Sequence, residues 1–320
     1  MSYHQTKPNY GNWIRRRILG RIGLMALLVE MLSLLPLPLV GRLILWIAGG
    51  ILFLVFLYIL SVYLLFSDHI GNFQTQIRQV LFAHIPWDGN GKALDIGTGN
   101  GALAIGLARQ YPQALVEGVD LWGAQWEYTQ SDCEHNAKLE QVEERVHFRQ
   151  GSAARLPYLD ETFDAVVSHF VFHEVDLPDK QQVLQEALRV VRPGGVFAFQ
   201  DMFLDTTLYG PIPDLLETLR SWGIQEVECI PTRDLLKIPF FVRNRRALGC
   251  AGILFGRKRT RLLLSFCSEQ VCTKKGGSRF SYPHFAVQNP HAAVSTGRMI
   301  DFLVERSQER QNQPMKGLQA

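Results

Sequence analysis

The stretch from Lys92 to Ala108, KALDIGTGNGALAIGLA, limits the fold of this chain more than any other segment. A short apolar run ends in Asp95, a glycine-rich turn follows, and a run of helix-forming residues comes next. Glycine accepts positive φ angles and lets a ligand approach bare backbone. The start of the following helix offers unpaired N–H groups to a carboxylate or a phosphate. The segment therefore predicts a strand, a tight loop and a helix, with a nucleoside-containing cofactor at the loop.

Two cofactor classes fit this loop. Residues 97–102 match the dinucleotide pattern G-x-G-x-x-G/A, with Ala102 last. With Asp95 included, the same residues match D-x-G-x-G-x-G. A glycine turn between a strand and a helix can also be only a tight connection. The loop alone leaves these three interpretations open.

The residues that follow the loop distinguish between these interpretations. Residues 114–119 indicate a second strand, and Asp120 at its end can accept hydrogen bonds from ribose hydroxyls. Both cofactor classes need that acid. Two further segments then follow: 151–169, and a helix stopped by Pro193-Gly194-Gly195 before a buried strand.

In this order the segments LDIGTGNG, VEGVDLW, GSAARLPYLDETFDAVVSHFVFHEV and LRVVRPGGVFAFQD resemble class I S-adenosylmethionine-dependent methyltransferases of the ubiquinone/menaquinone-biosynthesis type. The resemblance covers residues 92–201, and the flanking elements fit to about Gly256. It implies S-adenosylmethionine as cofactor. A nicotinamide dehydrogenase has no reason to carry the Leu-x-x-x-Arg-Pro-Gly-Gly piece.

The resemblance also implies which residues hold the cofactor: Asp95, Gly97, Thr98, Gly99, Gly101, Asp120, Leu121, Ser152, Ala153 and Ser168. The glycine loop would receive the amino-acid end, and Asp120 the ribose. Leu121 or Trp122 would pack on the adenine. Ser152 departs from the family, which usually has an acid there, and a hydroxyl accepts the adenine amine more weakly.

The segment Ser-His-Phe-Val-Phe-His-Glu-Val that ends at Val175 contains the candidates for a general base. A base is needed only if the methyl acceptor must lose a proton. His173 is the first choice, because its ordinary pKa lies near neutrality; His169 and Glu174 are the others. The alternative is a histidine that is packed for shape and hydrogen bonding.

The amino-acid composition limits which classes of binding partner and metal site we expect. There are 33 basic and 30 acidic residues, a net charge of +3, which does not favour nucleic acid as a partner. The five cysteines form no C-x-x-C pair, so we expect no zinc or other metal site, and they fit a reducing compartment. The oligomeric state cannot be read from the sequence.

The N-terminal region predicts a membrane hairpin. Residues 43–66 contain no charge, and about 20 apolar residues span a bilayer core. Residues 22–40 form a second candidate span, interrupted by Glu30, Pro36 and Pro38. The arginines of residues 15–21 place the N-terminus and the following domain in the cytoplasm, at the cell membrane. A signal peptide is the alternative.

Alternating strand and helix patterns predict an α/β fold with a doubly wound, mostly parallel seven-stranded sheet. The expected domains are a basic segment (1–21), two transmembrane helices (22–66), the methyltransferase domain (67–256) and a disordered tail (257–320). We expect strands near 92–96, 115–119, 146–150, 164–168, 195–200, 224–230 and 250–255. Residues 234–246 are basic and amphipathic, and form either a membrane-surface contact or an ordinary connection.

Three functions remain. The first is a membrane-anchored methyltransferase acting on a small or lipophilic acceptor. The second is a cofactor-binding sensor or scaffold without catalysis, suggested only by Ser152. The third is a nicotinamide oxidoreductase.

Overall fold

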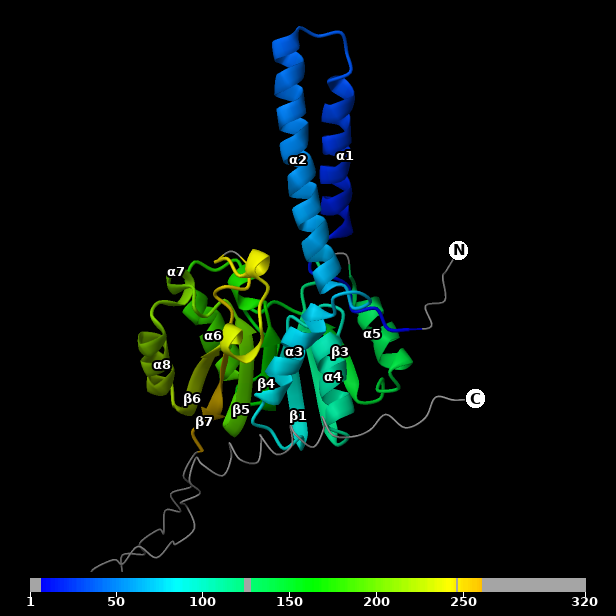
Figure 1. Cartoon of the computed structure of the whole chain (residues 1–320). Coiled ribbons are helices and arrows are strands. Elements are labelled where there is room, and N and C mark those ends of the chain that lie inside the picture. The colour runs from blue at the N-terminus through cyan, green and yellow to red at the C-terminus, as the bar shows by residue number, and fades with distance from the viewer. Residues whose placement is uncertain (1–6, 124–127, 246, 261–320) are drawn as a thin grey trace, which may run out of the picture. The chain divides into compact units, whose positions relative to one another are not determined.

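The computed structural model describes residues 7–260, except 124–127 and 246. Its centre is a seven-stranded sheet in the order β3-β2-β1-β4-β5-β7-β6 (Figure 1). The first five strands are parallel, and β7 pairs antiparallel with both β5 and β6. The strands are β1 Gly91–Ile96, β2 Ala114–Asp120, β3 Val146–Gln150, β4 Phe163–His169, β5 Val191–Asp201, β6 Ile224–Pro231 and β7 Gly252–Lys258. The predicted doubly wound, mostly parallel seven-stranded sheet is confirmed.

Helices cover both faces of this sheet. Alternate residues of a strand point to opposite faces, so Ala93 packs on one side with α3 (Phe73–Ala83), α4 (Ala102–Gln110) and α5 (Gln130–Leu139). Leu94 packs on the other side with α6 (Lys180–Arg189) and α8 (Ile212–Ser221). Because β1 lies between β2 and β4, the loops after these three strands meet at one edge.

Helix boundaries follow local capping signals. Gly101, with φ +80°, precedes α4, so the glycine loop leads directly into that helix. Thr129 and Asp132 form a capping box, which starts α5 at Gln130. The helix α6 ends at Arg189, and β5 begins at Val191, before Pro193-Gly194-Gly195 rather than after it.

Two antiparallel helices precede the domain: α1 (Arg16–Leu32) and α2 (Leu39–Phe66). The helices differ from the predicted spans, 22–40 and 43–66: α1 begins and ends earlier than the first span, and α2 begins earlier than the second but ends at the predicted Phe66. The helix α1 includes the arginines because no residue there breaks a helix, and the chain between the helices contains Pro36 and Pro38, of which Pro38 caps α2. Within the described residues, α2 alone is long and apolar enough to cross a membrane.

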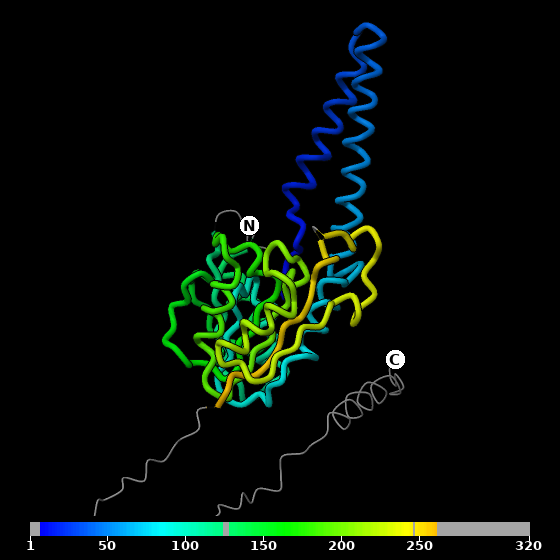
Figure 2. Tube along the Cα trace, turned by 90° about the vertical axis from the view of Figure 1, so that its left-hand side faces the viewer, coloured from blue at the N-terminus to red at the C-terminus, as the bar shows by residue number. Residues whose placement is uncertain are grey.

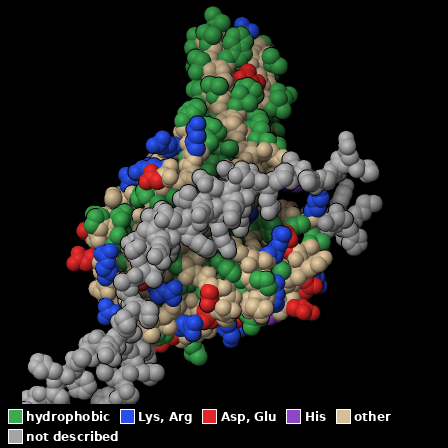
Figure 3. Space-filling view, turned by 60° about the horizontal axis from the view of Figure 1, so that its bottom comes forward, with side chains coloured by type: hydrophobic (Ala, Val, Ile, Leu, Met, Phe, Trp, Pro, Cys, Tyr) green, Lys and Arg blue, Asp and Glu red, His purple; other side chains and the backbone are tan. Residues whose placement is uncertain are grey.

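The two helices run antiparallel, side by side (Figure 2), and their contacts keep one register. Each step along α1 is matched by an equal step back along α2: the paired residues are Arg16 and Tyr63, Gly23 and Phe56, Glu30 and Gly49, and Ser33 and Trp46. Gly49 has no side chain, and Glu30 occupies the space that a Cβ there would fill. The surface of the helix pair is largely apolar (Figure 3).

A third apolar cluster joins the base of α2 to the domain. It contains Val62 and Phe66 from α2, Phe73 and Ile77 from α3, and Val242 from a short 3-10 helix, η2 (Phe240–Val242). The remaining short elements are η1 (Phe172–Glu174), α7 (Thr206–Tyr209) and α9 (Thr232–Leu235). Residues 261–320, most of the predicted disordered tail, lie outside the described residues.

Candidate active site

The glycine loop after β1 has the bare backbone that the sequence predicts. Gly97, Gly99 and Gly101 have φ values of +72°, +57° and +80°. A Cβ on Gly97 would lie 2.1 Å from the Val171 side chain. The loop therefore requires glycine both for conformation and for space.

Asp120 stands at the end of β2 beside this loop. Its Oδ2 accepts from the Gly99 N–H at 2.9 Å, and its Oδ1 accepts from the Trp122 N–H at 3.0 Å. Each carboxylate oxygen keeps a further acceptor site. Leu121 lines the cavity next to the loop. The Trp122 side chain points toward the glycine loop, where its Nε1–H donates to the Gly99 carbonyl. Leu121 is therefore the better candidate for the adenine contact.

The remaining predicted residues divide into two groups. Ser152 and Ala153 line the cavity, and the Ser152 hydroxyl accepts from the Ala154 N–H. Ser168 is buried in β4, and its hydroxyl donates to the Ile96 carbonyl at 2.9 Å. This bond joins two strands, and it is the next residue, His169, that lines the cavity.

Asp95 is 1% exposed and lines the same cavity. Its Oδ2 accepts from the Thr98 hydroxyl at 2.7 Å and from the Ala104 N–H at 3.0 Å, and its Oδ1 has no partner within the described chain. Burial raises the pKa of Asp95 to about 7. Arg78 of α3 also lines the cavity, with its guanidinium over the Tyr10 ring, and burial lowers the pKa of this arginine. The site thus contains a carboxylate and a buried cation.

His173 lines the cavity, and the buried Asp201 lies behind it. The His173 Nδ1 lies 3.0 Å from the Asp201 Oδ1. Asp201 is held in place because it also accepts from the N–H groups of Phe172, His173 and Met202 and from the Tyr209 hydroxyl. Burial lowers the pKa of His173, but the hydrogen bond and the charge of Asp201 outweigh it, so the pKa is raised.

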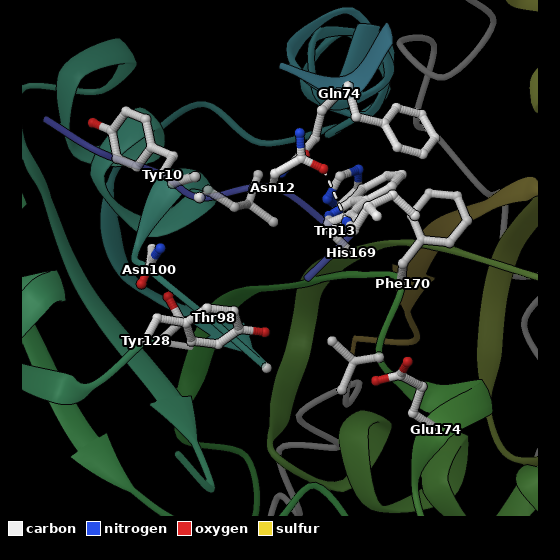
Figure 4. A pocket seen from close by; sticks show the side chains of 18 of the residues that line it. Tyr10, Asn12, Trp13, Gln74, Thr98, Asn100, Tyr128, His169, Phe170 and Glu174 are labelled. Carbon is white, nitrogen blue, oxygen red and sulfur yellow. Dashed lines mark hydrogen bonds between the residues drawn. The ribbon is translucent and has the colours of Figure 1, made fainter. Parts of the chain in front are cut away.

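The two other candidate bases differ from His173. Burial lowers the pKa of His169 to about 3, so this ring is neutral near pH 7. Burial raises the pKa of the Glu174 carboxyl, which also faces the cavity (Figure 4). Among the three, His173 combines cavity exposure with a carboxylate that orients its ring.

The N-terminal segment covers the cavity, which the sequence did not predict. Asn9 bonds to Asn136 of α5 in both directions, and the Tyr10 hydroxyl donates to Glu140. Trp13 packs between Phe66, His169 and Phe170, with ring centroids 5.0–5.4 Å apart. Figure 4 shows Tyr10, Asn12 and Trp13 crossing above the site. The basic segment and the base of the helix pair are thus parts of the site.

These residues together fit S-adenosylmethionine. The glycine loop exposes backbone where a ligand must come close, and Asp120 has acceptor capacity for ribose hydroxyls. The free Oδ1 of Asp95 suits the cationic amino group, and Arg78 suits the carboxylate of the methionyl part. The cavity holds about 1450 Å³, which is more than the ~300–1000 Å³ of a typical small-molecule site.

Comparison with known proteins agrees with this geometry. Residues 94–199 match the family described as a methyltransferase domain. The chain contains a methyltransferase domain. This match, with the relatives below, confirms the predicted S-adenosylmethionine-dependent class and its cofactor, and decides between the two interpretations of the glycine loop.

Three curated relatives illustrate the likeness. Methyltransferase GfsG of Streptomyces halstedii is 31% identical, over 44% of this chain and 48% of its own length. The 27-O-demethylrifamycin SV methyltransferase of Amycolatopsis mediterranei is 35% identical, over 41% and 45%. The ubiquinone/menaquinone biosynthesis C-methyltransferase UbiE of Desulfotalea psychrophila is 34% identical, over 41% and 47%. The chain therefore spans about half the length of these relatives.

Proposed function

We propose that the whole chain is a membrane-anchored methyltransferase that moves a methyl group from S-adenosylmethionine to a small or lipophilic acceptor. One observation supports this most: a single cavity is lined by the glycine loop and Asp120 at one part and at another by His173, whose ring is held by the buried Asp201. A cofactor site and an oriented base in one cavity are what a transfer with proton removal requires.

The residues of the chain would act as follows. S-adenosylmethionine, when bound, supplies an electrophilic methyl group on a sulfonium. Asp201 accepts the Nδ1–H of His173, which leaves the Nε2 of that ring as the basic atom. Nε2 would take the proton that the acceptor loses when it is methylated. The covering N-terminal segment and α2 base exclude water from this space.

The anchoring part of the proposal rests on α2 and on where the ends of the hairpin lie. The chain before α1 bonds to α5, through Asn9 and Asn136, and the end of α2 packs on α3. Both ends of the hairpin are therefore on the side of the domain. If α2 enters a bilayer, α1 returns within the same membrane, with Arg15–Arg21 on the cytoplasmic side.

Two experiments test the proposal. Purified full-length protein is incubated with cofactor carrying a labelled methyl group and with a membrane extract; label in an extracted compound is the expected result. Cofactor binding without any transfer would favour the sensor. For the anchor, reporter fusions at residues 40 and 70 should report opposite sides of the membrane, and the same side for both would contradict the hairpin.

A further inference from the structure

We propose, building on the methyl-transfer function above, that the acceptor is an amphiphile dissolved in the bilayer and that it enters the cavity at the base of α2. Its apolar tail would stay among the side chains of α2 and η2. Its head, which carries the proton to be lost, would reach His173.

The first observation is the extent of the cavity. One continuous space runs from Asp120 and the glycine loop to α2, where Tyr58, Ile59 and Val62 line it. Val242 and Leu248 also line this end, so most of its wall beside α2 is aromatic or aliphatic, and Arg16, which bonds to Tyr63, adds a charged group at its rim. This apolar end is distinct from the end that holds Asp95, Arg78 and Asp120, and it fits an apolar chain.

The second observation is where the bilayer surface would cross α2. The helix has 28 residues, which is about 42 Å at ~1.5 Å per residue. A core of ~30 Å takes about 20 of them, and from Leu39 this ends at Tyr58. Exposure changes at the same place: most large apolar side chains are exposed up to Tyr58, whereas Val62 and Phe66 are buried. A hydrocarbon core that begins at Leu39 would therefore end where the exposure of α2 changes, at Tyr58.

The third observation comes from the register of the hairpin. Arg16 bonds to Tyr63, and the same register brings Arg21 level with Tyr58. The basic residues of α1 therefore lie beside the last two turns of α2, at the level of lipid head groups. Arginine and tyrosine at this depth are typical of a membrane interface.

The segment at η2 shares this level. The Tyr58 hydroxyl donates to the Phe241 carbonyl at 2.9 Å, which fixes η2 against α2. The neighbouring side chain of Phe240 is 89% exposed. Tyr58 itself is 44% exposed and also lines the cavity, so the cavity reaches the molecular surface here. A mouth at the bilayer boundary admits a molecule from the lipid phase.

The experiment uses the full chain in vesicles of phosphatidylcholine and phosphatidylglycerol. The probe is a phenol with a long alkyl tail that carries a photoreactive diazirine; the same head group with a short tail is the control probe. After illumination, mass spectrometry maps the labelled residues. Ile59→Trp fills the proposed mouth, and Ile51→Trp makes the same change on the lipid-facing part of α2. Binding of S-adenosylmethionine is measured for each protein.

We expect the long-tailed probe to label Val62, Phe66 or Val242 in the wild type. This labelling should be lost in Ile59→Trp and kept in Ile51→Trp, and the short-tailed probe should not produce it. Labelling of the wild type only at residues 39–57 of α2, on the lipid-facing side of Tyr58, would overturn the proposal, whether or not Ile59→Trp folds. Cavity label that Ile59→Trp leaves unchanged would also overturn it. Failure of the proposed function is a separate result: the wild type would then bind no S-adenosylmethionine, or would bind it and transfer no labelled methyl group, whatever the labelling map.

Discussion

Asp95 makes cofactor binding depend on pH in a way that the structure predicts. Its carboxyl is buried, one oxygen has no partner, and its pKa is about 7. A cationic ligand favours the ionised form, so binding should be strong above the pKa and should weaken as the pH falls through it. Asp95→Asn keeps the shape and the acceptor for Thr98 and Ala104, but cannot ionise.

The magnitude follows from the ionised fraction. If only the ionised form binds, the apparent dissociation constant is the intrinsic value divided by that fraction. The fraction is about one half at pH 7 and about 3% at pH 5.5, so affinity should fall about fifteenfold over this range. The amino group of the ligand, with an α-amino pKa of ~7.7–8.0, stays mostly protonated there.

Isothermal titration with S-adenosylmethionine measures this directly and needs no acceptor. The full-length protein should lose affinity as the pH is lowered, whereas Asp95→Asn should be weaker at pH 7 by ~1.5–3 kcal/mol and nearly flat below it. Any slope common to both proteins belongs to other groups, of which His173 is one. A wild type without pH dependence, or a variant with the same slope, would refute the reasoning.

Three further predictions concern the same cavity. Asp120→Ala should weaken cofactor binding by ~1.5–3 kcal/mol, since it removes a charged acceptor; an unchanged dissociation constant would contradict the ribose assignment. Gly97→Val should abolish binding in the same titration, because its side chain would collide with Val171, and any retained affinity would count against the loop geometry. The rate of transfer should fall as the pH drops through the raised pKa of His173, whose neutral form is the base. Replacing Asp201 by Asn should move that limb to lower pH, because burial then dominates; a pH–rate profile that does not move would exclude this pair.

The sheet and the cofactor residues could be predicted because their signals are local. Asp95 and Asp120 each stand at the end of an apolar run, and the glycines between strand and helix are adjacent in the chain. The boundaries of helices depend on short capping signals. Thr129 and Asp132, which are three residues apart, form such a signal and mark the start of α5.

The cover of the site could not be predicted, because its contacts join distant parts of the chain. Asn9 and Asn136 are 127 residues apart, and neither belongs to a periodic pattern. The sequence indicates Arg78 only weakly as a site residue. It is a charged residue directly after Ile77, on the buried side of an amphipathic helix. Asp201 ended a recognised segment, but only the fold brings it to His173.

The docked N-terminal segment has a consequence for how the protein matures. Residues 7–16 and 58–66 line one cavity with the domain, yet the whole hairpin separates them in the chain. During synthesis the first wall emerges before the hairpin and the remainder after it. The cavity is complete only once α1 and α2 have paired and returned both ends to the domain. A chain that has not yet formed the hairpin therefore lacks part of the wall of its candidate active site.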